Sequence, residues 1–376
     1  KIVDSSQAPD PLVDYSRCRA CSHVSVCLPD EHLGKVVERR VHARNPDSQV
    51  VHLTRQGSRV SMRRGRLIVY APSAEEQSIP VERVHSLVLH GNIDVSSAVI
   101  RELSWRNCTI IWCSSSGRVY SWSQPARLPN GHTRVRQHVI SEAGHLGLAR
   151  EFVSAKIANQ ATLLRRNGDD LAAVDRLRHL QRRALETGNL VELFGVEGEA
   201  ASAYFQSFPT MLSRRALAKS NFRWGGRQGR GATDPINVLL NYCYGLLTSE
   251  CIRALVTCGL DPNAGILHSS TRNKPAMALD LMEEFRQPIA DSIVVSVINR
   301  SEISEKSFSR VTGSPRLTTD ARKVLVRAFE RRMLTEFKHP AFGYSVSWRR
   351  AVEVQARMVL GVFEGSLADY KGVKIR

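Results

Sequence analysis

The segment PARLPNGHT, residues 125–133, separates two different hydrophobic patterns in the chain. Two prolines and an Asn-Gly pair interrupt regular structure, so we expect a hinge here. Before it, residues 49–124 consist of short β-branched runs broken by glycine and proline, which predict a mostly β domain. After it, residues 134–376 repeat apolar side chains with a period of 3.6. The predicted fold class is α+β: a β-rich N-terminal domain followed by a larger all-α domain.

Within each predicted domain, the pattern also locates individual elements. Residues 96–105 have helical spacing behind a serine cap, Ser96 or Ser97. The runs CTIIWC and RVYSWS, on either side of a Ser-Ser-Gly turn, predict a β-hairpin over residues 108–123. In the second domain, helical periodicity covers about 134–187, 196–208, 234–259, 276–299, 318–338 and 344–363.

The charge of the chain indicates a polyanionic partner. Its 53 Lys and Arg outnumber its 36 Asp and Glu, for a net charge of +17. Such an excess favours nucleic acid or an anionic membrane surface. The apolar runs are far shorter than the roughly 20 residues of a membrane-spanning helix, so we expect no membrane insertion.

Five of the eight cysteines are scattered through apolar surroundings, where a thiol packs as a small hydrophobic side chain. No disulfide framework is evident, which favours a reducing cytoplasm. The scattered thiols predicted to lie in the core are Cys108, Cys113, Cys243, Cys251 and Cys258.

Three segments of the helical domain contribute side chains that bind hard metal ions. Glu197 stands where GVEGEAASAYFQSF is expected to open a helix, and His268 ends the short apolar run of GILHSS. On the helix of PAMALDLMEEFRQP, Asp280 and Glu283 are three residues apart and can converge on one point. Carboxylates suit Mg²⁺ and Mn²⁺, and an imidazole is compatible with Mn²⁺. Such an ion polarises a phosphodiester and activates a water or a 3′-hydroxyl.

Each of these residues also has an ordinary structural interpretation. Paired acids on a helix are usually a solvated face, and a histidine in a loop is usually structural or exposed. Glu197 at a helix N-terminus could simply interact with the helix dipole. Periodicity alone therefore does not establish a metal site.

The most basic stretch lies between the first two of these segments. Residues 200–233 contain no acid, several arginines and four glycines. Arginine binds phosphate in a bidentate manner, and an aromatic ring can stack on an unpaired base. The alternative is a basic loop with no specific role. The candidate DNA-binding residues are Arg214, Arg215, Lys219, Arg223, Trp224, Arg227 and Arg230.

An ordered series of long motifs resembles the CRISPR adaptation integrase, a metal-dependent DNA endonuclease. They are AREFVSAKIANQATLLRR (149–166), GVEGEAASAYF (195–205), DPINVLLNYCYGLLTSE (234–250), GLDPNAGILH (259–268), PAMALDLMEEFRQPIADSIVVSVINR (275–300) and LTTDARKVLVRAFERRM (317–333). The resemblance implies insertion of spacer DNA into a CRISPR array, as a part of antiviral defence. The 3′-hydroxyl of the spacer attacks a phosphodiester at the end of a repeat. The implied substrates are double-stranded spacer precursors with single-stranded 3′ ends, and CRISPR repeat DNA.

The resemblance also assigns residues and partners. Glu197 matches the Glu of the family's E-G motif, and His268 matches the His of its G-x-L-H motif. Glu283 matches an acid that is Asp in many members, and Asp280 matches a second acid beside the metal. The implied cofactor is Mn²⁺ or Mg²⁺, bound by Glu197, His268 and Glu283. The implied partners are a second copy, joined through the β-rich domain at 49–124, and a small ferredoxin-like subunit.

A separate resemblance concerns the N-terminus. DYSRCRACSHVSVCLP is similar to the tail of the CRISPR adaptation exonuclease, whose [4Fe–4S] cluster is bound by one upstream and three C-terminal cysteines. Cys18, Cys21 and Cys27 match those three, and thiolates suit iron–sulfur ligation. We therefore expect a fusion to this exonuclease, with residues 1–31 as its tail and 32–48 as a linker. A zinc site is the alternative, and it also lacks its fourth ligand in this chain.

Two further functions remain as alternatives to an integrase. A non-catalytic DNA-binding scaffold subunit would keep the fold and the basic surface without turnover. The complete set of Glu197, His268 and Glu283 argues against it. An RNA-binding helical protein would explain the charge of the chain but not these acids.

Overall fold

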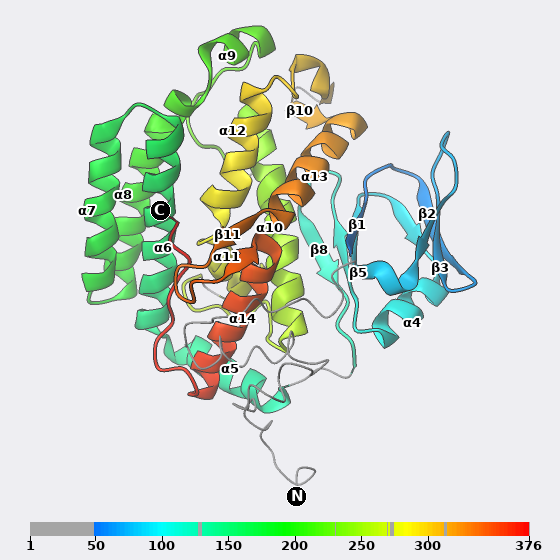
Figure 1. Ribbon diagram of the computed structural model, residues 1–376, viewed down its shortest axis with the longest axis horizontal. Helices are drawn as coiled ribbons and strands as arrows, with labels where there is room; N and C mark the ends of the chain where they lie inside the picture. The colour runs from blue at the N-terminus through cyan, green and yellow to red at the C-terminus, as the bar shows by residue number, and fades with distance from the viewer. Residues whose placement is uncertain are drawn as a thin grey trace, which may run out of the picture.

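The computed structural model shows a smaller β-rich part beside a larger, mostly helical part (Figure 1). The predicted cluster ligands Cys18, Cys21 and Cys27, together with Arg230, lie outside the described residues, as does all of 1–48. The structure describes residues 49–126, 130–229, 231–268, 270, 274–311 and 314–375.

The β-rich part consists of two four-stranded sheets. In the first, with order β1-β5-β7-β8, three parallel strands are followed by one antiparallel strand; the strands are β1 (Gln49–Leu53), β5 (Val84–His90), β7 (Thr109–Cys113) and β8 (Val119–Trp122). The second has order β4-β3-β2-β6, and its strands are β2 (Ser58–Arg63), β3 (Arg66–Tyr70), β4 (Gln77–Pro80) and β6 (Ile93–Val95). A short 3₁₀ turn, η1 (Val81–Arg83), precedes β5.

Two local predictions in this part are confirmed. Helix α4 (Ser97–Trp105) begins behind Ser96, whose hydroxyl accepts the backbone N–H of Val99 at 3.4 Å. Strands β7 and β8 form the expected antiparallel hairpin. Helix α4 and the second sheet pack together against one face of the first sheet.

The first sheet is buried on both faces, which explains the continuous apolar runs of its strands. Leu87 and Leu89 of β5 face the small core of the β-rich part, whereas Val88 joins the core of the helical part. Ile110 and Ile111 of β7 divide in the same way. The helical core therefore continues onto the sheet.

The helical part surrounds a long central helix, α10 (Pro235–Thr257), most of whose residues are buried (Figure 1). Asp234 caps this helix, accepting the backbone N–H of Asn237 at 2.9 Å. The other helices are α5 (Gly131–Ala143), α6 (Leu146–Asn167), α7 (Leu171–Glu186), α8 (Leu190–Ser207), α9 (Arg214–Ser220), α11 (Ala276–Met282), α12 (Ser292–Asn299), α13 (Thr319–Leu334) and α14 (Trp348–Glu364). Short helical turns are η2 (Phe208–Met211), η3 (Arg286–Asp291) and η4 (Glu305–Ser307).

The β-rich and mostly helical division is confirmed, but the second part is not all-α. It carries two hairpins, whose strands are β9 (Phe308–Val311), β10 (Ser314–Leu317), β11 (Glu336–Lys338) and β12 (Ser345–Ser347). The helices predicted at 318–338 and 344–363 were thus too long at these ends. Phe337 of β11 stacks on Trp348 with ring centroids 3.9 Å apart, so a tertiary contact favours the strand over the helix.

Two other boundaries differ from the prediction. The helix expected at 134–187 is three helices, interrupted at Gly144, which has φ of +82°, and before Asp170, which caps α7. The Asn-Gly pair of the predicted hinge instead begins α5 at Gly131. Other features agree with the sequence: the five core cysteines are buried and free, and no described helix is long and apolar enough to cross a membrane.

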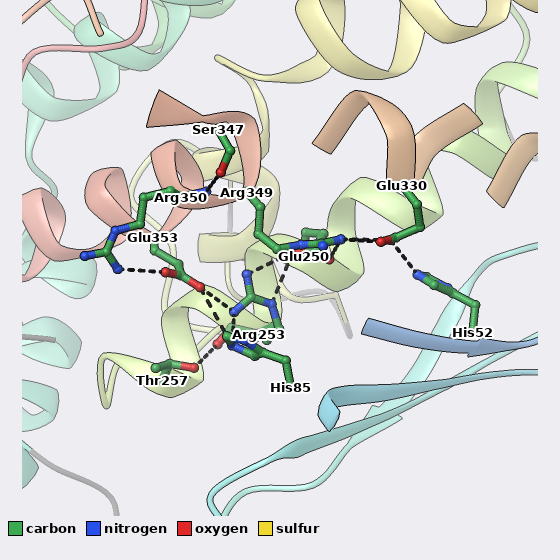
Figure 2. A network of polar contacts seen from close by, with 10 residues as sticks. All are labelled: His52, His85, Glu250, Arg253, Thr257, Glu330, Ser347, Arg349, Arg350 and Glu353. Atoms are coloured by element: carbon green, nitrogen blue, oxygen red, sulfur yellow. Dashed lines mark hydrogen bonds and ion pairs between the residues drawn. The ribbon is translucent and has the colours of Figure 1, made fainter. Parts of the chain in front are cut away.

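A buried ionic network joins the first sheet to the helices (Figure 2). Arg253 of α10 donates to Glu250 at 2.9 Å and to Glu353 of α14 at 2.7 Å. His85 of β5 lies 2.7 Å from the same guanidinium. Burial raises the pKa of Glu250, but the charges of Arg349 and Arg253 outweigh it and lower the pKa to about 2. The ion pair of Glu250 and Arg253 therefore stays charged at neutral pH.

The β7–β8 turn lies against α10 at a glycine. A Cβ on Gly245 would lie 2.1 Å from the backbone oxygen of Gly117. We predict that Gly245→Ala lowers the free energy of unfolding by about 1–3 kcal/mol, because backbone must move. Gly195→Ala is the control: its Cβ meets open space within α8, so it should stabilise by about 0.5–1 kcal/mol. Urea denaturation measures both, and a Gly245→Ala variant as stable as the parent would contradict the close packing.

Candidate active site

Four elements of the helical part bring the predicted acids and histidine together. Glu197 comes from α8, His268 from the segment before α11, and Glu283 directly follows α11. The ammonium of Lys156, on α6, bonds to Glu197 and lies 2.8 Å from Glu283 Oε2. The Nε2 of His268 lies 4.0 Å from Glu283 Oε1. Glu197 and Glu283 thus share one lysine, which sequence reasoning did not assign to the site, and His268 lies beside Glu283.

Asp280 holds His268 in place. Its carboxylate is fully buried and lies 2.6 Å from His268 Nδ1. It also accepts the backbone N–H groups of Ile266, Leu267 and His268 at 2.6–2.9 Å. With its oxygens used in this way, Asp280 is a positioning residue; it fixes the ring so that Nε2 is left for another partner.

Glu283 is a buried carboxylate between two cations. Arg286 donates to it at 2.8 Å and 3.1 Å, and Lys156 contacts it from the opposite helix. Burial raises the pKa of Glu283, but the charges of Arg286 and Lys156 outweigh it and lower the pKa to about 2. Glu283 is therefore an ionised oxygen donor at neutral pH.

The backbone after Glu283 departs from the single helix predicted at 276–299. Helix α11 ends at Met282, and residues 286–291 wind as a π-helix before α12 begins. Pro288 lies in this stretch and cannot donate a backbone hydrogen bond, which disfavours a regular α-helix. π-Helical turns are frequent at functional sites, and this one positions Arg286 beside Glu283.

Glu197 lies in the interior of α8, not at its start as predicted. The helix begins at Leu190, capped by Asn189, so a helix-dipole role for Glu197 is excluded. Its side chain is 26% exposed, and no atom would contact a Cβ on the flanking Gly195 or Gly198. Glu197 thus remains accessible from outside, whereas Asp280 and Glu283 are buried and do not form the solvated face considered as an alternative.

A cavity of about 1150 Å³ reaches His268 and Glu283. Basic side chains line this cavity, and they come from a turn, a loop, a strand and helices that lie far apart in the sequence. No local run of positive charge therefore predicted them. They are Arg118, Lys274, Arg286, Arg316 and Arg322.

Some of the predicted DNA-binding residues contact the protein core in the structure, and others are exposed. The ring of Trp224 stacks on Phe208 with centroids 5.0 Å apart, and its indole N–H donates to the Phe205 carbonyl. Arg227 bonds two asparagine side chains of α10 and lies over the Tyr244 ring. Both residues thus hold the loop onto the core, and their contact with DNA stays a prediction. The exposed residues among the candidates are Arg214, Arg215, Lys219 and Arg223.

In the part of the chain that the structure describes, no group of three His, Cys, Asp or Glu side chains is arranged to hold a metal ion. The donor set nevertheless fits a divalent cation: two carboxylates and an imidazole whose second nitrogen is held by an acid. In this structure Lys156 bonds both carboxylates.

The model of the family "CRISPR associated protein Cas1" matches residues 51–331. The chain belongs to the Cas1 family. A Cas1 endonuclease of Thermus thermophilus is 33% identical over 86% of this chain and 95% of its own. A Cas4 exonuclease/Cas1 endonuclease fusion of Rhodospirillum rubrum is 34% identical over 98% of this chain. The chain spans 65% of that relative's length.

Solved structures of Cas1 proteins share the fold. A Cas1 protein of Thermotoga maritima gives a TM-score of 0.73 at 21% identity, covering 86% of this chain and 99% of its own. A casposase bound to its integration product gives 0.73 at 22% identity, covering 87% and 94%. These similarities confirm the arrangement of a β-rich part followed by a mostly helical part.

Proposed function

We propose that this chain is a metal-dependent DNA integrase and endonuclease that inserts spacer DNA into a CRISPR array. The observation that carries the proposal is the convergence of Glu197, His268 and Glu283 beside a basic cavity in a member of the Cas1 family. Relatives named as endonucleases, and the fold shared with a casposase bound to an integration product, support it. The DNA is expected to be a spacer precursor with single-stranded 3′ ends, together with repeat DNA.

In this proposal each group of the site has its own role. Glu197, Glu283 and His268 Nε2 would hold Mn²⁺ or Mg²⁺, which supplies Lewis-acid activation of a phosphodiester. Asp280 keeps the proton of His268 on Nδ1, so that Nε2 has a free lone pair. The spacer's own 3′-hydroxyl is the nucleophile. The bond from phosphorus to one repeat oxygen breaks as the new phosphodiester forms, so no protein nucleophile is required.

The partners belong to the same proposal. We expect a homodimer formed through residues 49–124, and a small ferredoxin-like subunit that bridges two dimers. A solved complex of a Cas6-RT-Cas1 protein with Cas2 shares the Cas1 fold and is consistent with such an assembly. The named fusions support an exonuclease joined to residues 1–31, where Cys18, Cys21 and Cys27 would supply three ligands of a [4Fe–4S] cluster.

Strand joining tests the proposal directly. The parent should join a spacer to a repeat-containing plasmid only with Mn²⁺ or Mg²⁺. Glu197→Ala should lower the rate by at least ~10³-fold, because several kcal/mol of transition-state stabilisation depend on the ion. Its DNA affinity should change less than about threefold, since phosphate contacts dominate binding.

Glu199→Ala is the matched control on the same helix. Glu199 pairs with Arg176 at the surface, 3.0 Å away, and should be dispensable for joining. A Glu197→Ala variant that joins DNA as well as the parent would refute this active site. A parent that binds DNA without joining it would instead indicate a DNA-binding scaffold.

The cavity predicts where DNA phosphates bind. Arg316→Ala should weaken DNA binding about equally for all sequences and lower the salt dependence of log K by about 1, the effect of one lost phosphate contact. Arg178→Ala, on α7 and outside the cavity lining, is the control. Fluorescence anisotropy over a salt series measures both, and equal slopes for Arg316→Ala and the parent would place the DNA elsewhere.

A further inference from the structure

Lys156 has an unusual position for a lysine. Only 5% of it is exposed, and its ammonium bonds carboxylates from two different elements, Glu197 and Glu283. Lysine is almost never fully buried without such pairing. With Arg286 on the other side of Glu283, two cations already balance the two acids. The oxygen donors of the site are therefore neutralised by the protein itself.

The two cations of the site are not equivalent. Of the two carboxylates, Arg286 contacts that of Glu283. Its guanidinium also lies over the Tyr244 ring, 4.4 Å from the centroid. Lys156 bridges both acids, so a cation bound to the pair would meet its charge at close range. A lysine ammonium is a point charge on a flexible four-carbon stem, so it can move without disturbing its helix.

We propose that Lys156 is an internal competitor for the divalent cation, displaced from Glu197 and Glu283 when the metal binds. This inference rests on the proposed function, whose metal site it regulates. The competing charge keeps metal affinity low in the free protein. A DNA phosphate beside the site gives the displaced ammonium a new partner, so DNA and metal bind cooperatively.

Titration of the full chain with Mn²⁺, followed by electron paramagnetic resonance of the free ion, tests the competition. Lys156→Met should bind Mn²⁺ at least about tenfold more tightly than the parent, because a positive charge within a few ångströms is removed. Lys323→Met removes the same charge from a partly exposed position on α13, and its affinity should match the parent's. Spacer DNA should raise the Mn²⁺ affinity of the parent more than that of Lys156→Met.

The outcomes separate the inference from the function. Mn²⁺ affinity unchanged or weaker in Lys156→Met would overturn the competitor role while leaving the metal site intact. No Mn²⁺ binding by the parent, with or without DNA, would overturn both.

A measurement on the parent covers the case in which Lys156→Met fails to fold. Acetylation of lysines by acetic anhydride, mapped by mass spectrometry, should rise at Lys156 when Mn²⁺ is added, because its ammonium leaves the carboxylates. Lys323 supplies the internal reference. Labelling of Lys156 that stays level or falls with Mn²⁺ would contradict displacement.

Discussion

Replacing His268 by alanine should lower metal-dependent joining of spacer DNA by at least ~10³-fold, with DNA affinity within about threefold of the parent. The imidazole is the nitrogen donor of the proposed metal site, and its Nε2 lies 4.0 Å from Glu283 Oε1. A metal ligand contributes little to the phosphate contacts that dominate DNA binding. Single-turnover joining and a gel-shift assay measure the two quantities separately.

Asp280→Asn should give a smaller, graded loss. The amide changes the hydrogen bond that fixes His268 Nδ1 but leaves the ligands themselves in place. Loss of such a supporting contact typically costs about 10–100-fold in metal affinity or activity. Raising the Mn²⁺ concentration should restore part of the rate for Asp280→Asn and none for His268→Ala. Equal, unrecoverable losses in both variants would show that Asp280 does more than orient the ring.

Arg253→Met should lower the free energy of unfolding by about 3–5 kcal/mol, because it leaves buried carboxylates without their shared partner. Arg253 is 1% exposed, and its guanidinium bonds both Glu250 and Glu353 (Figure 2). Through His85 the same network reaches the first sheet. Chemical denaturation followed by circular dichroism measures the change.

An exposed ion pair supplies the control. Arg178 lies 3.0 Å from Asp175, but both side chains are more than half exposed. Arg178→Met should therefore change stability by less than about 1 kcal/mol. If Arg253→Met were equally mild, the buried network would contribute little to the junction of sheet and helices.

The division of the fold could be read from the sequence because periodicity changes sharply after residue 124. Helix starts with a strong local signal were also predictable, as with Ser96 before α4 and Asp234 before α10. The ends that failed depend on contacts distant in the chain. Phe337 forms a strand because it stacks on Trp348, and no local pattern reports that contact.

Prediction of the site from sequence is limited in the same way, by contacts that no local pattern reports. Glu197, His268 and Glu283 were found through motifs, and the structure brings them together. The role of Lys156 in the site was not predicted. Helix α6 is buried along most of its length, so a charged residue there has no periodic signal of its own. The structure adds a role for Trp224 that composition did not suggest: its ring stacks on Phe208 within the protein.

Anomalous diffraction from crystals of the protein with spacer DNA and Mn²⁺ tests the central claim most directly. The account predicts a manganese peak within coordination distance of Glu197, Glu283 and His268 Nε2, with the 3′ end of the spacer beside it. A structure in which manganese binds elsewhere, while Glu197 and Glu283 keep their contacts with Lys156, would contradict it.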